Sequence, residues 1–182
     1  HGFESAAEFN SFRYSDYCFK KFMESAEKEN YFHNTIFVFI GDHGVSGNAE
    51  AVYPAVWTDQ RLTDEHVPLL FYAPYLLQAQ KRNEVVSQID VLPTIAGLLH
   101  QPYLNTSLGR NVLSPDKKND YAFTIHHDEG RIGMVTNSFY FEKNINFPDE
   151  HLYPLDNSIY TYSKQQVDSI RDRLSEVTTA YY

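Results

Sequence analysis

The chain has little cysteine, little positive charge and no long apolar run. Cys18 is its only cysteine, which excludes an internal disulfide and a cysteine-based zinc site. Lys and Arg number 15 against 24 Asp and Glu, giving a formal charge of -9, so we expect neither a nucleic-acid binder nor a binder of anionic membranes. The longest apolar stretches, 36–40 and 67–73, are far shorter than the roughly 20 residues of a membrane helix, and no span is expected here.

What the chain does contain fits a globular protein. Of its 182 residues, 42% are hydrophobic and 21% are charged, a balance typical of a folded domain. It has no internal repeat and no linker-like stretch, which indicates one domain or the larger part of one. It opens at His1 without an initiator methionine or a signal-type segment, as a fragment or processed product does. Any site in it is therefore expected to be incomplete.

The first third of the chain follows the order helix, strand, polar turn. Helical spacing of apolar residues predicts a helix over Ala6–Asn30. The continuous apolar run Thr35–Ile40 predicts a strand covered on both faces, and it ends at the turn Gly41–Gly44. In α/β proteins, ligands usually bind at the carboxyl ends of strands. The sequence therefore predicts a ligand-binding site at this turn.

The remaining elements alternate between helix and strand. The sequence predicts a long loop over Gly44–Glu65, a strand over Val67–Tyr72, a helix over Asp90–Leu99 with Asp90 as its cap, strands over Tyr121–Ile125 and Arg131–Glu142, a loop containing Pro148 and Pro154, and a helix over Ser163–Ala180. We therefore predict an α/β fold with a mixed, largely parallel sheet flanked by helices.

Asp42 and His43 are the strongest candidates for chemistry. A carboxylate and an imidazole that are adjacent on a tight turn can both point at one metal ion, and flanking glycines leave room for a ligand. The residues alone leave a second interpretation open, in which a turn aspartate caps a helix beside an ordinary surface histidine.

The surrounding sequence resembles the alkaline phosphatase/sulfatase superfamily. Four segments occur in the family's order: Asn34–Gly44, which matches its Asn-Thr-(apolar strand)-x-Asp-His-Gly pattern, His66–Pro74, Ser87–Leu99 and Leu108–Leu113. Arg13–Tyr17 and the tyrosine-rich carboxyl end are similar to the branch that contains lipoteichoic acid synthase-like phosphoglycerol transferases.

This resemblance implies a metal-dependent enzyme that acts on phosphate or sulfate esters. It makes Asp42 and His43 ligands of a divalent metal, which is Mn, Zn, Ca or Mg. The other ligands and the nucleophile, a Thr in transferases or a formylglycine in sulfatases, belong to a strand and turn upstream of His1. Residues 1–182 are then the carboxyl-terminal part of a sulfatase-like catalytic domain, and their partner is the amino-terminal half of the same protein. The resemblance also implies an extracytoplasmic domain tethered by upstream membrane helices.

Two further histidines match substrate-binding positions of the resemblance. His66 lies just before the second strand, where it can donate a hydrogen bond to an ester oxygen, although a strand-edge histidine packed beside Pro68 fits equally well. His1 matches the histidine of a substrate-contacting segment, but the proline of that segment is missing. Cys18 lacks the Cys-x-Pro-x-Arg pattern of sulfatase maturation and is expected to be a small buried residue.

Three functions remain open from sequence. The flanking segments favour a phosphoglycerol-type transferase over an arylsulfatase-type hydrolase. From a different class, the chain can be a non-catalytic binding or vestigial subdomain, because two protein ligands seldom hold a divalent ion tightly.

Overall fold

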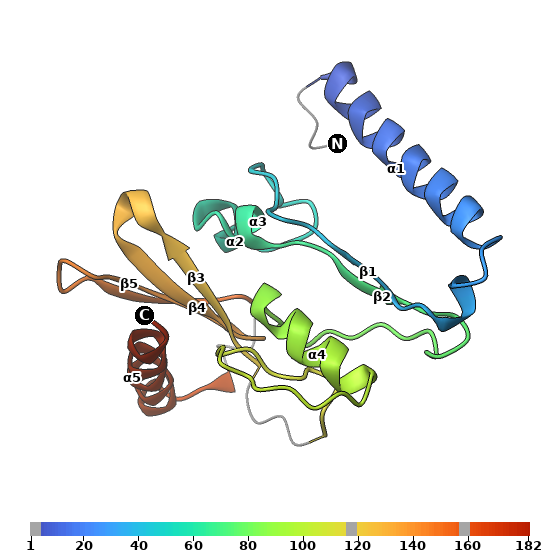
Figure 1. Ribbon diagram of the computed structural model, residues 1–182. Helices are drawn as coiled ribbons and strands as arrows, with labels where there is room; N and C mark the ends of the chain where they lie inside the picture. The colour runs from blue at the N-terminus through green and yellow to red at the C-terminus, as the bar shows by residue number, and fades with distance from the viewer. Residues whose placement is uncertain (1–4, 116–119, 157–160) are drawn as a thin grey trace. The chain divides into compact units, whose positions relative to one another are not determined.

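The computed structural model describes residues 5–115, 120–156 and 161–182. The chain divides into two compact units, His1–Lys81 and Arg82–Tyr182, whose elements can be followed by colour in Figure 1. The amino-terminal unit contains a long helix and a pair of strands. The carboxyl-terminal unit contains a short helix, a sheet and a terminal helix.

The first helix, α1 (Ala6–Ala26), confirms the helix predicted for this region. It packs on the first strand through aromatic rings. Phe19 meets Phe39 edge-on with ring centroids 5.6 Å apart, and Phe22 meets Phe37 at 6.1 Å. Rings on one side of the helix make these contacts, and many of its other side chains stay exposed.

The expectation that Cys18 is buried is wrong. Its side chain is exposed on α1. The amphipathic pattern of the helix predicts a buried face, but only a narrow part of that face is covered by the strands of this unit. A cysteine beside the contacting rings therefore remains open to solvent.

Strands β1 (Phe37–Ile40) and β2 (Leu69–Tyr72) pair antiparallel, with Ile40 opposite Leu69. Both begin two residues later than predicted. The expected burial on both faces is not found, because Ile40 is 41% exposed and Leu70 is 52% exposed. One helix that contacts the pair through a few rings cannot cover both faces of a sheet.

The segment predicted as a long loop holds two short helices, α2 (Val56–Asp59) and α3 (Leu62–Glu65). Leu62 is 2% exposed and anchors the segment. Each helix is a single turn, too short for a helical repeat of apolar residues to be visible in the sequence. A 3₁₀ turn, η1 (Phe32–Asn34), precedes β1.

The sheet of the carboxyl-terminal unit has four strands in the order β3-β4-β5-β6. They are β3 (Ala122–His126), β4 (Arg131–Val135), β5 (Phe139–Asn144) and β6 (Glu150–Pro154), and a 3₁₀ turn, η3 (His127–Glu129), joins the first two. Helix α5 (Lys164–Tyr181) packs on one face of this sheet around a core of Met134, Phe139, Phe141 and Leu174. The terminal helix predicted from sequence is thus confirmed.

The α/β class is confirmed, but the described strands do not show the expected largely parallel arrangement. Every strand pair that the described residues form is antiparallel. Only a few residues connect successive strands of the four-stranded sheet, and such short connections can join antiparallel strands only. Strand β6 occupies part of the predicted proline-marked loop, with Pro154 at its end. Because β6 is an edge strand, a proline is tolerated there.

The helix predicted over Asp90–Leu99 is also present, as α4 (Val91–Leu98), and a 3₁₀ turn, η2 (Gln88–Asp90), precedes it. Among the described helices, none is long and apolar enough to cross a membrane.

Candidate functional site

The turn after β1 holds Asp42 and His43 in one hydrogen-bonded arrangement. The backbone N–H of His43 donates to Asp42 Oδ1 at 3.0 Å, and His43 Nδ1 lies 2.7 Å from the carbonyl oxygen of Gly44. A carbonyl oxygen can only accept, so Nδ1 carries the ring proton and the lone pair of Nε2 is left for a ligand. The structure thus selects the imidazole tautomer that a metal needs.

The separation of the two side chains fits one shared ion. His43 Nε2 and Asp42 Oδ2 are 3.9 Å apart, and both side chains are largely exposed, at 78% and 92%. Two ligand atoms that each sit about 2.1 Å from an ion lie within about 4.2 Å of each other. Within residues 5–115, 120–156 and 161–182, no three His, Cys, Asp or Glu side chains gather as a metal site. Asp42 and His43 therefore stay a predicted pair of ligands.

The environment of His43 favours its protonated form. The hydrogen bond to the Gly44 carbonyl raises the pKa of His43 above its ordinary 6.5, and the carboxylates of Asp42 and Asp64 raise it further. A metal and a proton compete for Nε2. Metal affinity at this turn is therefore expected to increase as the pH rises through the raised pKa.

Backbone hydrogen bonds join the turn to the segment that precedes β2. Gly41 N donates to the carbonyl of Pro68 at 3.3 Å, and Gly44 N donates to the carbonyl of Asp64 at 2.6 Å. A Cβ atom added at Gly44 would lie 1.9 Å from the carbonyl oxygen of Thr63. Only glycine therefore allows this close approach.

We expect Gly44→Ala to destabilise the amino-terminal unit by roughly 1–3 kcal/mol, because the backbone of Thr63 must move to admit a methyl group. Urea unfolding monitored through Trp57, the only tryptophan in the chain, measures this change. Gly47→Ala is the matched control, since a Cβ at Gly47 meets nothing within 4 Å. Equal stability of the two variants would contradict the tight approach at Gly44.

The same two hydrogen bonds place His66 near the candidate metal pair. They flank Asp42 and His43 on one segment and residues 65–67 on the other, so the backbone of His66 lies opposite that of the turn. Its exposed ring contacts Trp57 at 5.1 Å and Tyr53 at 5.8 Å between centroids. A role for His66 beside the Asp42-His43 pair therefore stays a prediction. His1 lies outside the described residues.

Sequence reasoning missed Tyr53 and Trp57, and the available signal was weak. Both lie in the segment that follows the Asp-His-Gly turn, where a long loop is often functional. Aromatic residues are common throughout this chain, at 15%. Two of them in a predicted loop therefore do not indicate a functional role unless their contact with His66 is known.

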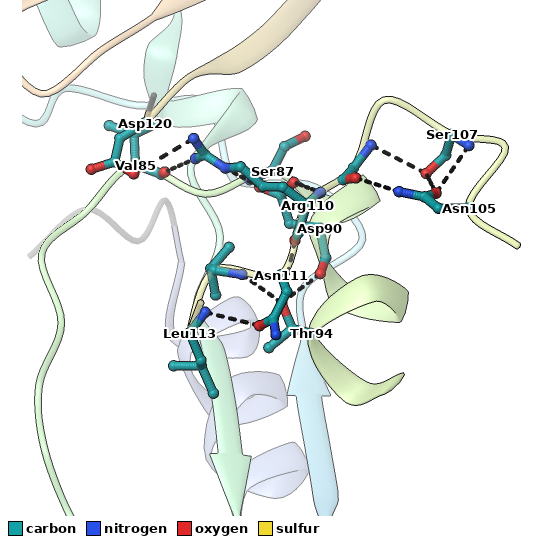
Figure 2. Close-up of polar contacts among 12 residues, drawn as sticks. Val85, Ser87, Asp90, Thr94, Asn105, Ser107, Arg110, Asn111, Leu113 and Asp120 are labelled. Atoms are coloured by element: carbon teal, nitrogen blue, oxygen red, sulfur yellow. Dashed lines mark hydrogen bonds and ion pairs between the residues drawn. The ribbon is translucent and has the colours of Figure 1, made fainter. Parts of the chain in front are cut away.

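A second polar cluster, in the carboxyl-terminal unit, surrounds the buried carboxylate of Asp90 (Figure 2). Asp90 is the N-cap residue of α4, as predicted, but its side chain bonds no N–H group of that helix. It is 3% exposed and accepts from two other backbone N–H groups, Ser87 at 2.9 Å and Arg110 at 2.8 Å. The guanidinium of Arg110 lies 3.7 Å from the same carboxylate and donates to the carbonyl of Val85 at 2.8 Å. Asp90 thus joins two segments distant in sequence.

Neighbouring residues extend this cluster. Thr94 Oγ1 donates to the Asp90 carbonyl at 2.7 Å and accepts from Val112 N at 3.1 Å. Asn105 Nδ2 donates to the carbonyl of Gly109 at 2.7 Å. Residues 85–94 and 105–113 therefore form one hydrogen-bonded clasp, which we define as the Asp90 clasp. The hydrogen bonds join the two segments to each other, which gives the clasp a structural role.

Comparison with known proteins gives three findings. The family model "Sulfatase" matches residues 5–101, more than half of the chain. The lipoteichoic acid synthase-like protein YvgJ of Bacillus subtilis (strain 168) is 26% identical over 142 residues, covering 72% of this chain and 22% of that protein. The chain thus spans about a fifth of this curated relative.

Two solved structures share the fold at low identity. The crystal structure of Ps i-CgsB superposes with a TM-score of 0.62 and 22% identity, over 89% of this chain and 39% of that one. The structure of BT4656 in complex with its substrate D-glucosamine-2-N,6-O-disulfate gives a TM-score of 0.58 and 17% identity, over 89% and 37%.

Proposed function

Because this chain belongs to the sulfatase family, we propose that the intact protein cleaves or transfers a phosphate or sulfate ester with the help of a divalent metal. In this proposal, residues 1–182 are the carboxyl-terminal part of its sulfatase-like catalytic domain. The observation that carries it is the Asp42-His43 pair at the end of β1, whose tautomer and 3.9 Å separation suit one ion. The pair lies inside the segment that the family model matches.

Each residue of the turn has a role in this proposal. Asp42 Oδ2 and His43 Nε2 hold the metal, and the Gly44 carbonyl fixes the imidazole by accepting from Nδ1. His66 donates a hydrogen bond to an ester oxygen. The bound metal lowers the pKa of the nucleophile and neutralises charge on the ester oxygens. The nucleophile and the remaining ligands come from the rest of the protein.

A phosphoglycerol-type transferase is the more specific proposal, and the similarity to the lipoteichoic acid synthase-like protein YvgJ supports it. On the same basis we propose an extracytoplasmic location and a tether of membrane helices elsewhere in the protein. An arylsulfatase-type hydrolase is the alternative within the family.

The proposed partner of this chain is the remainder of the catalytic domain. Large apolar side chains are exposed on α1 and on the β1-β2 pair, including Phe9 at 46%, Phe12 at 48% and Leu70 at 52%. Exposed apolar surface of this kind marks an interaction site. The same surface favours the second candidate function, a non-catalytic subdomain that binds a partner through its aromatic residues.

Titration of this chain alone with Mn²⁺ and Zn²⁺ tests whether part of the metal site lies in the rest of the protein. We expect binding weaker than micromolar, weaker still below the His43 pKa, because two ligands seldom hold a divalent ion. We also expect no turnover of p-nitrophenyl phosphate or sulfate. Tight binding lost in Asp42→Ala, or turnover that survives repurification and disappears in His43→Ala, would show a complete site in this chain. Absence of metal-dependent ester turnover by the intact protein would favour the non-catalytic function.

A further inference from the structure

The segment of the chain that connects the Asp-His-Gly turn to β2 contains a stacked aromatic pair. The rings of Tyr53 and Trp57 lie 4.4 Å apart at an interplanar angle of 21°. The imidazole of His66 meets both rings edge-to-face, at 70° to Trp57 and 89° to Tyr53. The edge-to-face arrangement is a preferred geometry of aromatic pairs. The ring of His66 therefore contacts two aromatic rings that are stacked on each other.

The backbone that carries these rings is itself anchored. Tyr53 N donates to the carbonyl of Ala49 at 2.9 Å, and Ala49 N donates to Thr58 Oγ1 at 3.1 Å. His66 N donates to the carbonyl of Leu62 at 3.0 Å. Leu62 itself is 2% exposed, so its buried side chain anchors this part of the segment. The backbones of Tyr53 and His66 are thus each held by a hydrogen bond.

We propose that Tyr53 and Trp57 are positioning residues that fix the orientation of the His66 imidazole. The proposal deepens the function given above and rests on the role of His66 toward the ester. An exposed histidine at a strand edge otherwise samples several rotamers. Two edge-to-face contacts favour one rotamer by roughly tenfold or more. The segment that follows the metal-ligand turn thereby orients a side chain that meets the substrate.

Histidine NMR of this chain tests the positioning directly, without substrate or metal. In Trp57→Ala, the Cε1–Hε1 peak of His66 is expected to move toward the position of a histidine in an unfolded chain, because the ring current of the indole is lost. Trp57→Phe keeps an aromatic ring and should retain much of the original shift. The peak of His151, which stacks on Tyr153 in the other unit, is the internal control. An unmoved His66 peak in Trp57→Ala would overturn the proposal.

A double-mutant cycle in the intact protein tests the consequence for turnover. We expect Trp57→Ala and His66→Ala each to lower kcat/KM by roughly tenfold, and the double variant to be no worse than His66→Ala, because the indole acts through the imidazole. Trp57→Phe should restore much of the loss. Tyr182→Ala, which removes a 67% exposed ring from the carboxyl-terminal unit, is the matched control. Additive losses would contradict positioning through His66.

The two proposals fail in different ways. If the intact wild-type protein shows no metal-dependent turnover, the proposed function fails, and the NMR result still decides whether His66 is held. If turnover is present but the His66 peak has the same chemical shift in Trp57→Ala as in the wild type, the positioning proposal alone fails.

Discussion

Replacing Asp42 with alanine in the intact protein is expected to lower ester turnover by more than about 100-fold. Loss of an outer-shell partner of a metal already costs roughly 10–100-fold, and Asp42 is a proposed direct ligand. His43→Ala should have a similar effect. The double variant should be little worse than either single variant, because ligands of one ion act as a unit. Steady-state kinetics with p-nitrophenyl phosphate and sulfate over a range of Mn²⁺ concentrations measures the loss.

The control for this experiment removes a carboxylate from the same unit but not from the turn. Asp59→Ala takes an exposed acidic side chain from α2 and should leave turnover close to that of the wild type. Excess metal should partly restore activity in the Asp42 variant if a weakened site remains. Full activity of Asp42→Ala at low metal would contradict the role given to this residue.

Asp90→Ala is expected to destabilise the carboxyl-terminal unit by about 3 kcal/mol or more. The change removes the acceptor of two backbone N–H groups and a charge partner of Arg110. Loss of one member of a buried pair costs roughly 3–5 kcal/mol. In a unit of this size, that loss corresponds to a fall in melting temperature of more than about 10 °C. Thermal unfolding followed by circular dichroism measures it.

Two variants separate the Asp90 clasp from a simple charge effect. Asp90→Asn keeps the shape and one acceptor oxygen, so it should be less destabilising than Asp90→Ala. Asp120→Ala removes a carboxylate that lies 3.5 Å from the same guanidinium but is more exposed, at 23%, and its effect should be smaller still. An Asp120→Ala variant as unstable as Asp90→Ala would show that Arg110 pairing, not the two N–H contacts, holds the clasp.

The long elements of this fold were predictable because they repeat a pattern over many residues. Helices α1 and α5 each keep apolar residues at helical spacing over several turns. The family resemblance is confirmed by the match over residues 5–101, which contains three of the four segments that carried it. The short helices α2 and α3 and the edge strand β6 were missed. One helical turn contains no repeat, and Pro154 masks a strand whose pairing is decided by its neighbour β5.

The candidate site was predictable in its residue types but not in its contacts. The family resemblance, rather than the two residue types alone, makes Asp42 and His43 after an apolar strand a predicted metal pair. The position of His66 depends on the antiparallel register of β1 and β2, which the expected parallel sheet does not contain. The contacts of Trp57 and the burial of Asp90 depend on tertiary packing, and no local pattern in the sequence encodes them.

The metal content of the intact protein tests the central claim most directly. Wild-type protein, Asp42→Ala and His43→Ala are purified alike, dialysed against a limiting mixture of Mn²⁺, Zn²⁺, Ca²⁺ and Mg²⁺, and analysed by mass spectrometry of the elements. We predict one tightly held divalent ion per wild-type molecule and a large loss of that ion in both variants, with Asp59→Ala unchanged. Equal metal content in all four proteins would contradict a metal site at the turn after β1.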